Sequence, residues 1–194
     1  MATTWSIVAM SVGGWVAIGV LAVVVLFVIL AYNGLVGARN RVRNAYSQID
    51  VQLKRRYDLI PNLVETVKGY AAHEKETLER VVKARQQCID VSGVANQAQA
   101  ENMLTGALRQ LFALSESYPD LKANQNFSQL QEELTSTENK ISFSRQHYNN
   151  TVENYNTKLQ VFPTVLIANM FGFTPEEFFE LQDAAAREPV KVQF

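Results

Sequence analysis

Charged residues are absent from the first 38 positions of this 194-residue chain. All 18 lysines and arginines and all 19 aspartates and glutamates lie from Arg39 onward, at the density of an ordinary soluble domain. The sequence therefore divides into an uncharged N-terminal part and a soluble part, with room for one domain or two small ones. A net charge of -1 excludes a globally basic nucleic-acid binder, so we expect no nucleic-acid partner.

Residues that carry enzyme chemistry are also scarce. Cys88 is the single cysteine, which excludes an internal disulfide and a cysteine-built metal site. The sequence has no Gly-rich phosphate loop, dinucleotide fingerprint or His-Glu-x-x-His motif, so we expect no cofactor and no metal. Cys88 could form a nucleophile pair with His73 or His147, but its place near an apolar helix face favours a small buried side chain. We predict that the protein is not an enzyme.

An uncharged apolar stretch, Ile7 to Tyr32, fills most of the N-terminal part. As a helix its roughly 26 residues would reach about 39 Å, enough to cross a hydrocarbon core of about 30 Å with tilt. A cleaved signal peptide would have a basic N-terminal region and a shorter apolar stretch. We therefore predict an uncleaved transmembrane helix over residues 7–32, preceded by a short extracytoplasmic N-terminus, residues 1–6.

The flanks of this helix predict its orientation. Nothing basic precedes it, whereas Arg39, Arg41 and Arg43 follow it in a juxtamembrane basic segment, residues 33–44. Lys and Arg stay on the cytoplasmic side, so we expect the N-terminus outside and the C-terminal domain in the cytoplasm. The three arginines are also candidate contacts for anionic membrane lipids, or they could set the topology alone.

Small residues recur at four-residue spacing on one face of the same helix. Ala9, Gly13 and Ala17 form this stripe. Such stripes let transmembrane helices approach closely, although Gly and Ala are common in membrane helices in any case. These three positions are our candidate transmembrane packing residues, and they favour a homo-oligomer.

Apolar residues recur every three or four positions in four stretches after the anchor. The stretches are Ala38 to Ala72, Thr77 to Cys88, Leu104 to Tyr118 and Phe127 to Phe162. Sustained strand-like alternation is missing, so we predict an all-α chain. Its fold class is a single N-terminal transmembrane helix followed by an elongated antiparallel helical bundle, residues 45–162, of three to four long helices plus a short C-terminal helix.

The sequence allows two alternatives for each of two features of this arrangement. The second and third helices could stack end to end as a broken rod, or they could fold as a hairpin against the two long helices. The first bundle helix could continue the membrane helix or break at Asn33, Gly34 and Gly37, whereas Pro61 should bend it without ending it.

Polar residues interrupt the apolar faces at a few positions. A buried, unpaired Arg56 would cost several kcal/mol, so we expect it to reach solvent or to meet carbonyls or a carboxylate across the bundle, with Glu138, Glu153 and Glu65 as candidate partners. A band of Asn, Tyr and Arg lies on the fourth helix. Its members either fix helix register as buried polar pairs or form a protein-interaction surface. They are Arg145, Tyr148, Asn149, Tyr155 and Asn156.

The aromatic C-terminal segment, residues 163–194, differs in composition from the bundle. Thr174-Pro175-Glu176-Glu177 has the form of a helix start, so we predict a short helix that carries Phe178, Phe179 and Leu181. The aromatics of this segment either fold back on the bundle or form an exposed patch for a partner, another subunit or the membrane. Phe171, Phe173 and Phe178 are therefore further candidate protein-interaction residues.

Long irregular motifs in the chain resemble those of the LemA family. One is Gln48-Ile49-Asp50-Val51-Gln52-Leu53-Lys54-Arg55-Arg56-Tyr57-Asp58-Leu59-Ile60-Pro61-Asn62-Leu63-Val64. Others are Tyr32-Asn33-x-Leu35-Val36-x-x-Arg39-Asn40-x-Val42, Arg145-x-x-Tyr148-Asn149-x-x-Val152-x-x-Tyr155-Asn156, Phe162-Pro163 and Phe171-Gly172-Phe173. The resemblance implies a bacterial inner-membrane protein with one N-terminal helix and a cytoplasmic bundle, and it supplies no catalytic residue.

Two hypotheses of function follow from these observations. The first is a non-enzymatic, self-associating scaffold on the bacterial inner membrane. The second is an adaptor or regulator of another membrane protein system, such as a protease or sensor, that binds through the Asn/Tyr/Arg band or the Phe171 to Phe179 segment. Membrane lipids, a second copy of the chain and a membrane-protein partner are thus the expected partners.

Overall fold

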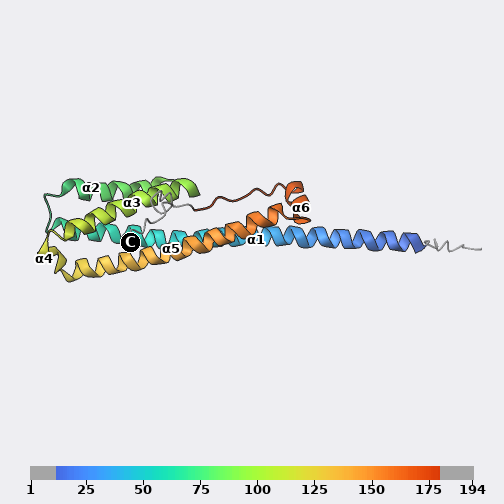
Figure 1. The fold of residues 1–194 in the computed structure, drawn as a ribbon, viewed down its shortest axis with the longest axis horizontal. Coiled ribbons are helices and arrows are strands. Elements are labelled where there is room, and N and C mark those ends of the chain that lie inside the picture. The colour runs from blue at the N-terminus through green and yellow to red at the C-terminus, as the bar shows by residue number, and fades with distance from the viewer. Residues whose placement is uncertain (1–11, 180–194) are drawn as a thin grey trace, which may run out of the picture.

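A computed structural model describes residues 12–179, which form six helices and, within that range, no strand (Figure 1). The fold class expected from the sequence is confirmed. Ala9 and Leu181 lie outside the described residues. The helices are α1 (Val12–Lys68), α2 (Lys75–Asp90), α3 (Val94–Ser115), α4 (Pro119–Lys122), α5 (Gln125–Gln160) and α6 (Thr164–Met170).

Helix α1 continues from the apolar N-terminal part through the whole bundle. Its 57 residues include Asn33, Gly34, Gly37 and Pro61, so the candidate membrane segment and the first bundle helix are one helix of about 85 Å. It is the one helix among the described residues that is long and apolar enough to cross a membrane. No α1 residue is buried from Gly13 to Leu30, and the first buried position is Ala31.

Helix α5 lies antiparallel to α1 and forms the second long element (Figure 1). Asn124 caps its start, where the Asn124 Oδ1 accepts from the Phe127 amide at 3.0 Å. The rings of Tyr46 and Tyr148 pack edge to face with their centres 5.7 Å apart, and Arg56 pairs with Glu138. These two contacts set the register of the α1–α5 pair. Phe162, expected on the apolar face of this helix, lies beyond its end and is exposed.

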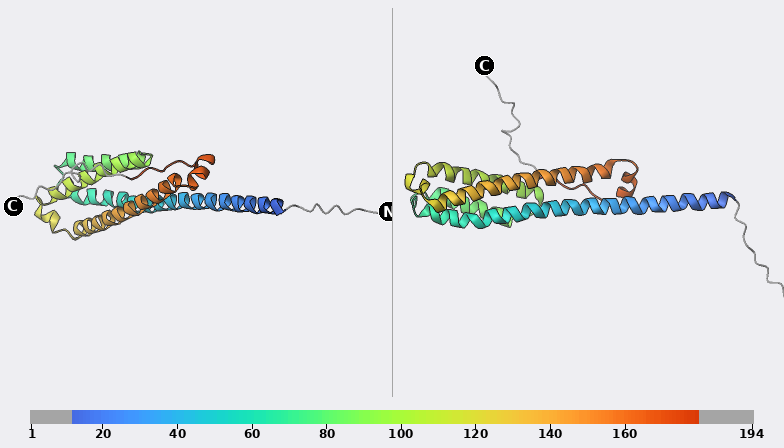
Figure 2. Two further views of the ribbon diagram at one scale, coloured as in Figure 1. Left: turned by 45° about the vertical axis from the view of Figure 1, so that its right-hand side comes forward. Right: turned by 90° about the horizontal axis from the view of Figure 1, so that it is seen from below.

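Helices α2 and α3 fold as a hairpin and cover the half of the α1–α5 pair that lies away from residue 12 (Figures 1 and 2). The turn between them passes through Gly93, whose φ of 91° suits a residue without a Cβ. Leu78, Val81, Leu104 and Leu111 pack with Ile60 of α1 in one apolar core. Of the two arrangements open from the sequence, the structure has the hairpin.

Helix α6 and the segment that follows it cover the other half of the α1–α5 pair. Ile167 and Ala168 pack with Ala31 and Leu35 of α1 in a second apolar core. The chain then returns along α5 as an extended segment, residues 173–179, which we call the strap.

The sequence predicts a short helix from Thr174 onward, and this prediction is wrong for residues 174–179. The Asn156 side chain bonds both the amide and the carbonyl of Glu176. Tyrosine hydroxyls bond the carbonyls of Thr174 and Glu177. Because α5 takes these backbone groups, they are not available for helical hydrogen bonds, and the short C-terminal helix forms earlier, as α6.

Candidate functional site

Two polar assemblies occupy the inside of the bundle. The first, which we call the charge cluster, joins Arg56 and Tyr57 of α1, Gln97 and Glu101 of α3 and Glu138 of α5. The second is the contact between α5 and the strap. Each assembly brings together residues that are distant in the sequence, and each falls on positions where the sequence pattern is polar instead of apolar.

Arg56 is the largest fully buried side chain of the described core. One guanidinium nitrogen, Nη1, pairs with the Glu138 carboxylate and donates to the Thr105 hydroxyl at 3.3 Å. The other, Nη2, pairs with the Glu101 carboxylate and lies 3.4 Å from the Glu101 carbonyl. Of the three carboxylates expected from the sequence, Glu138 is a partner. Neither Glu65 nor Glu153 is among the ion-pair partners of Arg56 within residues 12–179.

Glu101 is also fully buried, and it is not among the partners of Arg56 that the sequence predicts. Its second carboxylate oxygen accepts from the Tyr57 hydroxyl and from the Gln97 amide, the latter at 3.0 Å. The signal was present, because Gln97 and Glu101 extend the apolar face of α3 backwards from Leu104 at four- and three-residue steps. Two buried polar residues on a core-facing stripe indicate a buried network.

Cys88 lies beside this cluster and is buried. Burial, followed by the negative charge of Glu101, raises the pKa of its thiol to about 12. At neutral pH the group is therefore a thiol and not a nucleophilic thiolate. His73, in the α1–α2 turn, and His147, on α5, are both exposed, and the residues described here include no group of three or more His, Cys, Asp or Glu that could hold a metal ion.

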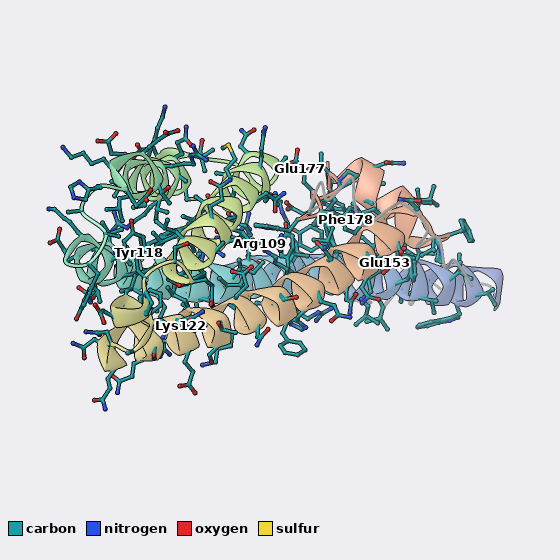
Figure 3. All side chains as sticks on the ribbon, turned by 60° about the vertical axis from the view of Figure 1, so that its left-hand side comes forward. Arg109, Tyr118, Lys122, Glu153, Glu177 and Phe178 are labelled. Atoms are coloured by element: carbon teal, nitrogen blue, oxygen red, sulfur yellow. The ribbon has the colours of Figure 1, made fainter. Side chains whose placement is uncertain are left out.

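Two asparagines of α5 hold the strap by its backbone. Asn149 donates to the Phe179 carbonyl at 3.2 Å and accepts from the Phe179 amide at 2.8 Å. Asn156 makes the same pair of bonds with Glu176, each at 2.9 Å. Tyr148 and Tyr155 add hydroxyl bonds to the carbonyls of Glu177 and Thr174 at 2.8 and 3.0 Å. In Figure 3, Phe178 is labelled beside α5 and Glu177 between α3 and α6.

The spacing of these residues explains why an extended segment fits. Tyr148-Asn149 recurs as Tyr155-Asn156 seven positions later, which places both pairs on one face of α5, about 10.5 Å apart. The two residues they bind, Glu176 and Phe179, are three positions apart, or about 10 Å in an extended chain. The repeated Tyr-Asn pair was visible in the sequence, but its partner was not.

Arg145 lies at one end of the contact between α5 and the strap. Its guanidinium carbon lies 4.7 Å from the centre of the Phe179 ring, and both side chains are buried. Burial and the charge of Arg56 lower the pKa of Arg145. The five band residues thus face the strap of their own chain, and binding of another protein at this band stays a prediction.

The remaining candidate residues lie at the α6 end of the bundle or on the free part of α1. Arg39 pairs with Glu176 at 3.5 Å, whereas Arg41 and Arg43 are exposed. Phe173 is half-buried and Phe171 and Phe178 are exposed, so the aromatic segment is divided between packing and exposure. Gly13 and Ala17 are exposed on α1.

Taken together, these features define a class of protein: an all-α bundle carried on one long helix whose apolar N-terminal part fits a single membrane crossing. A family model described as "LemA family" matches residues 45–194. The chain belongs to the LemA family.

Individual relatives agree with this assignment. Protein LemA of Metamycoplasma hominis is 32% identical over 156 residues, which cover 78% of this chain and 69% of the relative. Magnetosome protein MamQ of Magnetospirillum gryphiswaldense is 23% identical over 196 residues, covering 87% of this chain and 72% of that protein. Magnetosome protein MamQ 2 of Paramagnetospirillum magneticum is 23% identical over 195 residues, covering 86% and 72%. None of these names denotes an enzyme.

Proposed function

We propose that this protein is a non-enzymatic scaffold of the bacterial inner membrane, anchored by α1 and working by self-association. The observation that carries the proposal is the continuity of α1, which joins the candidate membrane segment to the bundle without a break. The Lys and Arg residues that follow this segment favour a cytoplasmic bundle.

The use of the polar residues supports a structural role. The carboxylates of the charge cluster, of which Glu101 is buried, are engaged by Arg56, Tyr57 and Gln97, and the asparagines and tyrosines of the band on α5 are engaged by the strap. A catalytic site needs a titratable group positioned to act on a substrate, whereas these carboxylates are bound by neighbouring side chains. The relatives named after the magnetosome associate other members of this sequence group with a cellular structure, which is consistent with a scaffold.

Two candidate contact positions for self-association lie midway along the bundle. Val51 of α1 and Phe143 of α5 are 65% and 72% exposed. They sit at the same level of the antiparallel pair, midway between the Tyr46–Tyr148 contact and the Arg56–Glu138 pair. Two large apolar side chains exposed at one level suit contact with a second copy of the chain.

Mass photometry of the full chain in native-lipid nanodiscs tests this proposal. We expect discrete assemblies above the monomer mass, and Phe143→Asp should shift them towards monomers because a charge there opposes an apolar contact. Gln129→Asp, an exposed substitution on the same helix, is the matched control and should leave the copy number unchanged. A wild-type chain that stays monomeric at micromolar concentration would refute self-association.

A groove at the end of the bundle away from the candidate membrane segment favours an adaptor role as the second candidate function. Val64, Leu78 and Val82 line it between α1 and α2, with Lys68, Lys75, Lys83, Glu65 and Glu79 around them, and its volume is about 890 Å³. An apolar floor with charged edges suits an amphipathic helix of a membrane-protein partner. A photo-crosslinker at Val82 should then capture one defined protein in cells, while the same crosslinker at Gln129 should not. Equal labelling at both positions would exclude the adaptor role.

A further inference from the structure

The end of the bundle next to the membrane segment carries exposed apolar side chains. Phe162, in the α5–α6 turn, is 79% exposed, and Met170, at the end of α6, is 72% exposed. Val161, Leu166 and Phe171 of the same region are each close to half exposed. Five large apolar side chains exposed within eleven residues form more than the scattered apolar positions of an ordinary soluble surface.

This end of the bundle is also uncharged. From Leu159 to Pro175 no residue is charged, and on α1 no residue is charged before Arg39. The charges that flank this end are Arg39 on α1, Lys158 on α5 and Glu176 on the strap, and Arg39 pairs with Glu176 at 3.5 Å. From Lys158 to Phe162 the chain would rise about 6 Å as a helix, and from Tyr32 to Arg39 α1 rises about 10 Å, so the uncharged layer is about 6–10 Å thick.

Contacts with α1 fix the depth of this layer. The Tyr32 ring lies 4.9 Å from the Phe171 ring and 5.7 Å from the Phe173 ring. Beyond this level α1 continues alone, as the right-hand view of Figure 2 shows, and the described residues Gly13 to Leu30 would span about 27 Å. That length approaches the hydrocarbon thickness of about 30 Å, so the uncharged end of the bundle falls at the membrane boundary.

We infer that the α5–α6 turn and α6 form a second membrane contact, which inserts Phe162, Leu166 and Met170 into the lipid at the boundary between headgroups and acyl chains. The depth agrees with the 5–10 Å to which interfacial elements bury an apolar face. A lone helix can tilt and rotate in a bilayer, and a second contact at one side of it restricts both motions. The inference rests on the proposed membrane anchoring by α1.

Spin-label accessibility in the full chain tests the inference. Single cysteines replace Phe162, Met103 or Val24 in a Cys88→Ala background, and the proteins are reconstituted in nanodiscs of phosphatidylcholine and phosphatidylglycerol. Met103 is the control, because it is a large exposed apolar residue of α3, a helix that carries neither of the proposed self-association positions. Oxygen partitions into lipid and a polar nickel chelate into water, so their relaxation effects report the surroundings of each label.

We expect the ratio of oxygen to nickel access at Phe162 to be several-fold higher than at Met103 and closer to the value at Val24. A ratio at Phe162 equal to that at Met103, with Val24 in lipid, would overturn the second contact and leave the anchor intact. Low access of both reagents at Phe162 would mean that protein covers it, which also overturns the inference. High nickel access at Val24 would instead refute the anchor.

Discussion

Arg56 is charged, buried and central, and its surroundings explain how the core tolerates it. Transfer of a lone guanidinium into the core would cost several kcal/mol, and the two carboxylates of Glu101 and Glu138 offset that cost. The three residues come from α1, α3 and α5. Because an ion pair of this kind is satisfied in only one arrangement, the charge cluster specifies the register of three helices.

Glu101→Gln should lower the free energy of unfolding by about 2–3 kcal/mol, because it leaves a buried arginine with one carboxylate instead of two. Thermal unfolding of the full chain in mild detergent, followed by circular dichroism, measures the change. Glu133→Gln is the matched control, since Glu133 pairs with Arg55 at 3.7 Å on the surface, and it should change stability by less than about 1 kcal/mol. Equal effects of the two substitutions would contradict the role given to the cluster.

A buried thiol and a buried tyrosine hydroxyl predict how the stability of the protein depends on pH. The thiol of Cys88 has its pKa raised from 9.0 to about 12, and the hydroxyl of Tyr148 from 10.0 to about 12, in both cases first by burial. Above the ordinary pKa the unfolded chain releases protons that the folded chain keeps, so the free energy of unfolding falls as pH rises.

The melting temperature should therefore be level between pH 7 and pH 8 and fall from about pH 9 upwards, more steeply above pH 10. In Cys88→Ala the fall between pH 9 and pH 10 should be smaller, while the fall above pH 10 remains. A melting temperature that rises over this range, or a Cys88→Ala profile parallel to the wild type, would show that the thiol is not shielded from ionisation.

At the scale of elements, the strap shows how an irregular segment is held without a helix or a sheet. Its backbone groups bond the side chains of α5 in place of a neighbouring strand. Each asparagine side chain, Asn149 or Asn156, uses one donor and one acceptor to bind the amide and the carbonyl of a single strap residue. A neighbouring strand would bind that residue in the same way. Each asparagine therefore supplies two of the hydrogen bonds that hold the strap, and Tyr148 and Tyr155 supply one each.

Asn156→Ala should release the part of the strap around Glu176, because it removes two hydrogen bonds worth about 2 kcal/mol together. Hydrogen exchange with mass spectrometry should show faster exchange in peptides that contain Glu176, with α1 and α3 unchanged. The matched control is Asn154→Ala, which removes only a bond to Asn150 of the same helix. If both variants exchange alike, the asparagine does not hold the strap.

Whether a feature could be predicted from the sequence depends on how far apart in the chain the interacting residues lie. Periodicity located α1, α2, α3 and α5, because a helix face is a local pattern. Thr174-Pro175-Glu176-Glu177 reads as a helix start, yet tertiary hydrogen bonds from α5 prevail over that local preference. Glu138 was found as a partner of Arg56 and Glu101 was not, because pairing across helices depends on which faces meet.

At the scale of the whole molecule, the bundle and the candidate membrane segment share one helix. The α1–α5 pair runs through the bundle, with the α2–α3 hairpin at one end and α6 with the strap at the other (Figures 1 and 2). The proposed scaffold role needs a fixed direction relative to the membrane, and an unbroken helix supplies it more directly than a flexible linker would. The continuity of α1 across Gly34 and Gly37 is therefore the central claim.

Distance measurement by pulsed electron spin resonance tests that claim most directly. Spin labels at Val25→Cys and Val51→Cys, in a Cys88→Ala background, lie on exposed positions on either side of the two glycines. Labelled chains are diluted with unlabelled ones in nanodiscs, so that only distances within one chain are measured. A continuous helix predicts one narrow distribution near 39 Å, from about 26 residues at 1.5 Å each. A broad distribution, or one centred well below that distance, would show that α1 bends at the membrane boundary and would contradict the account.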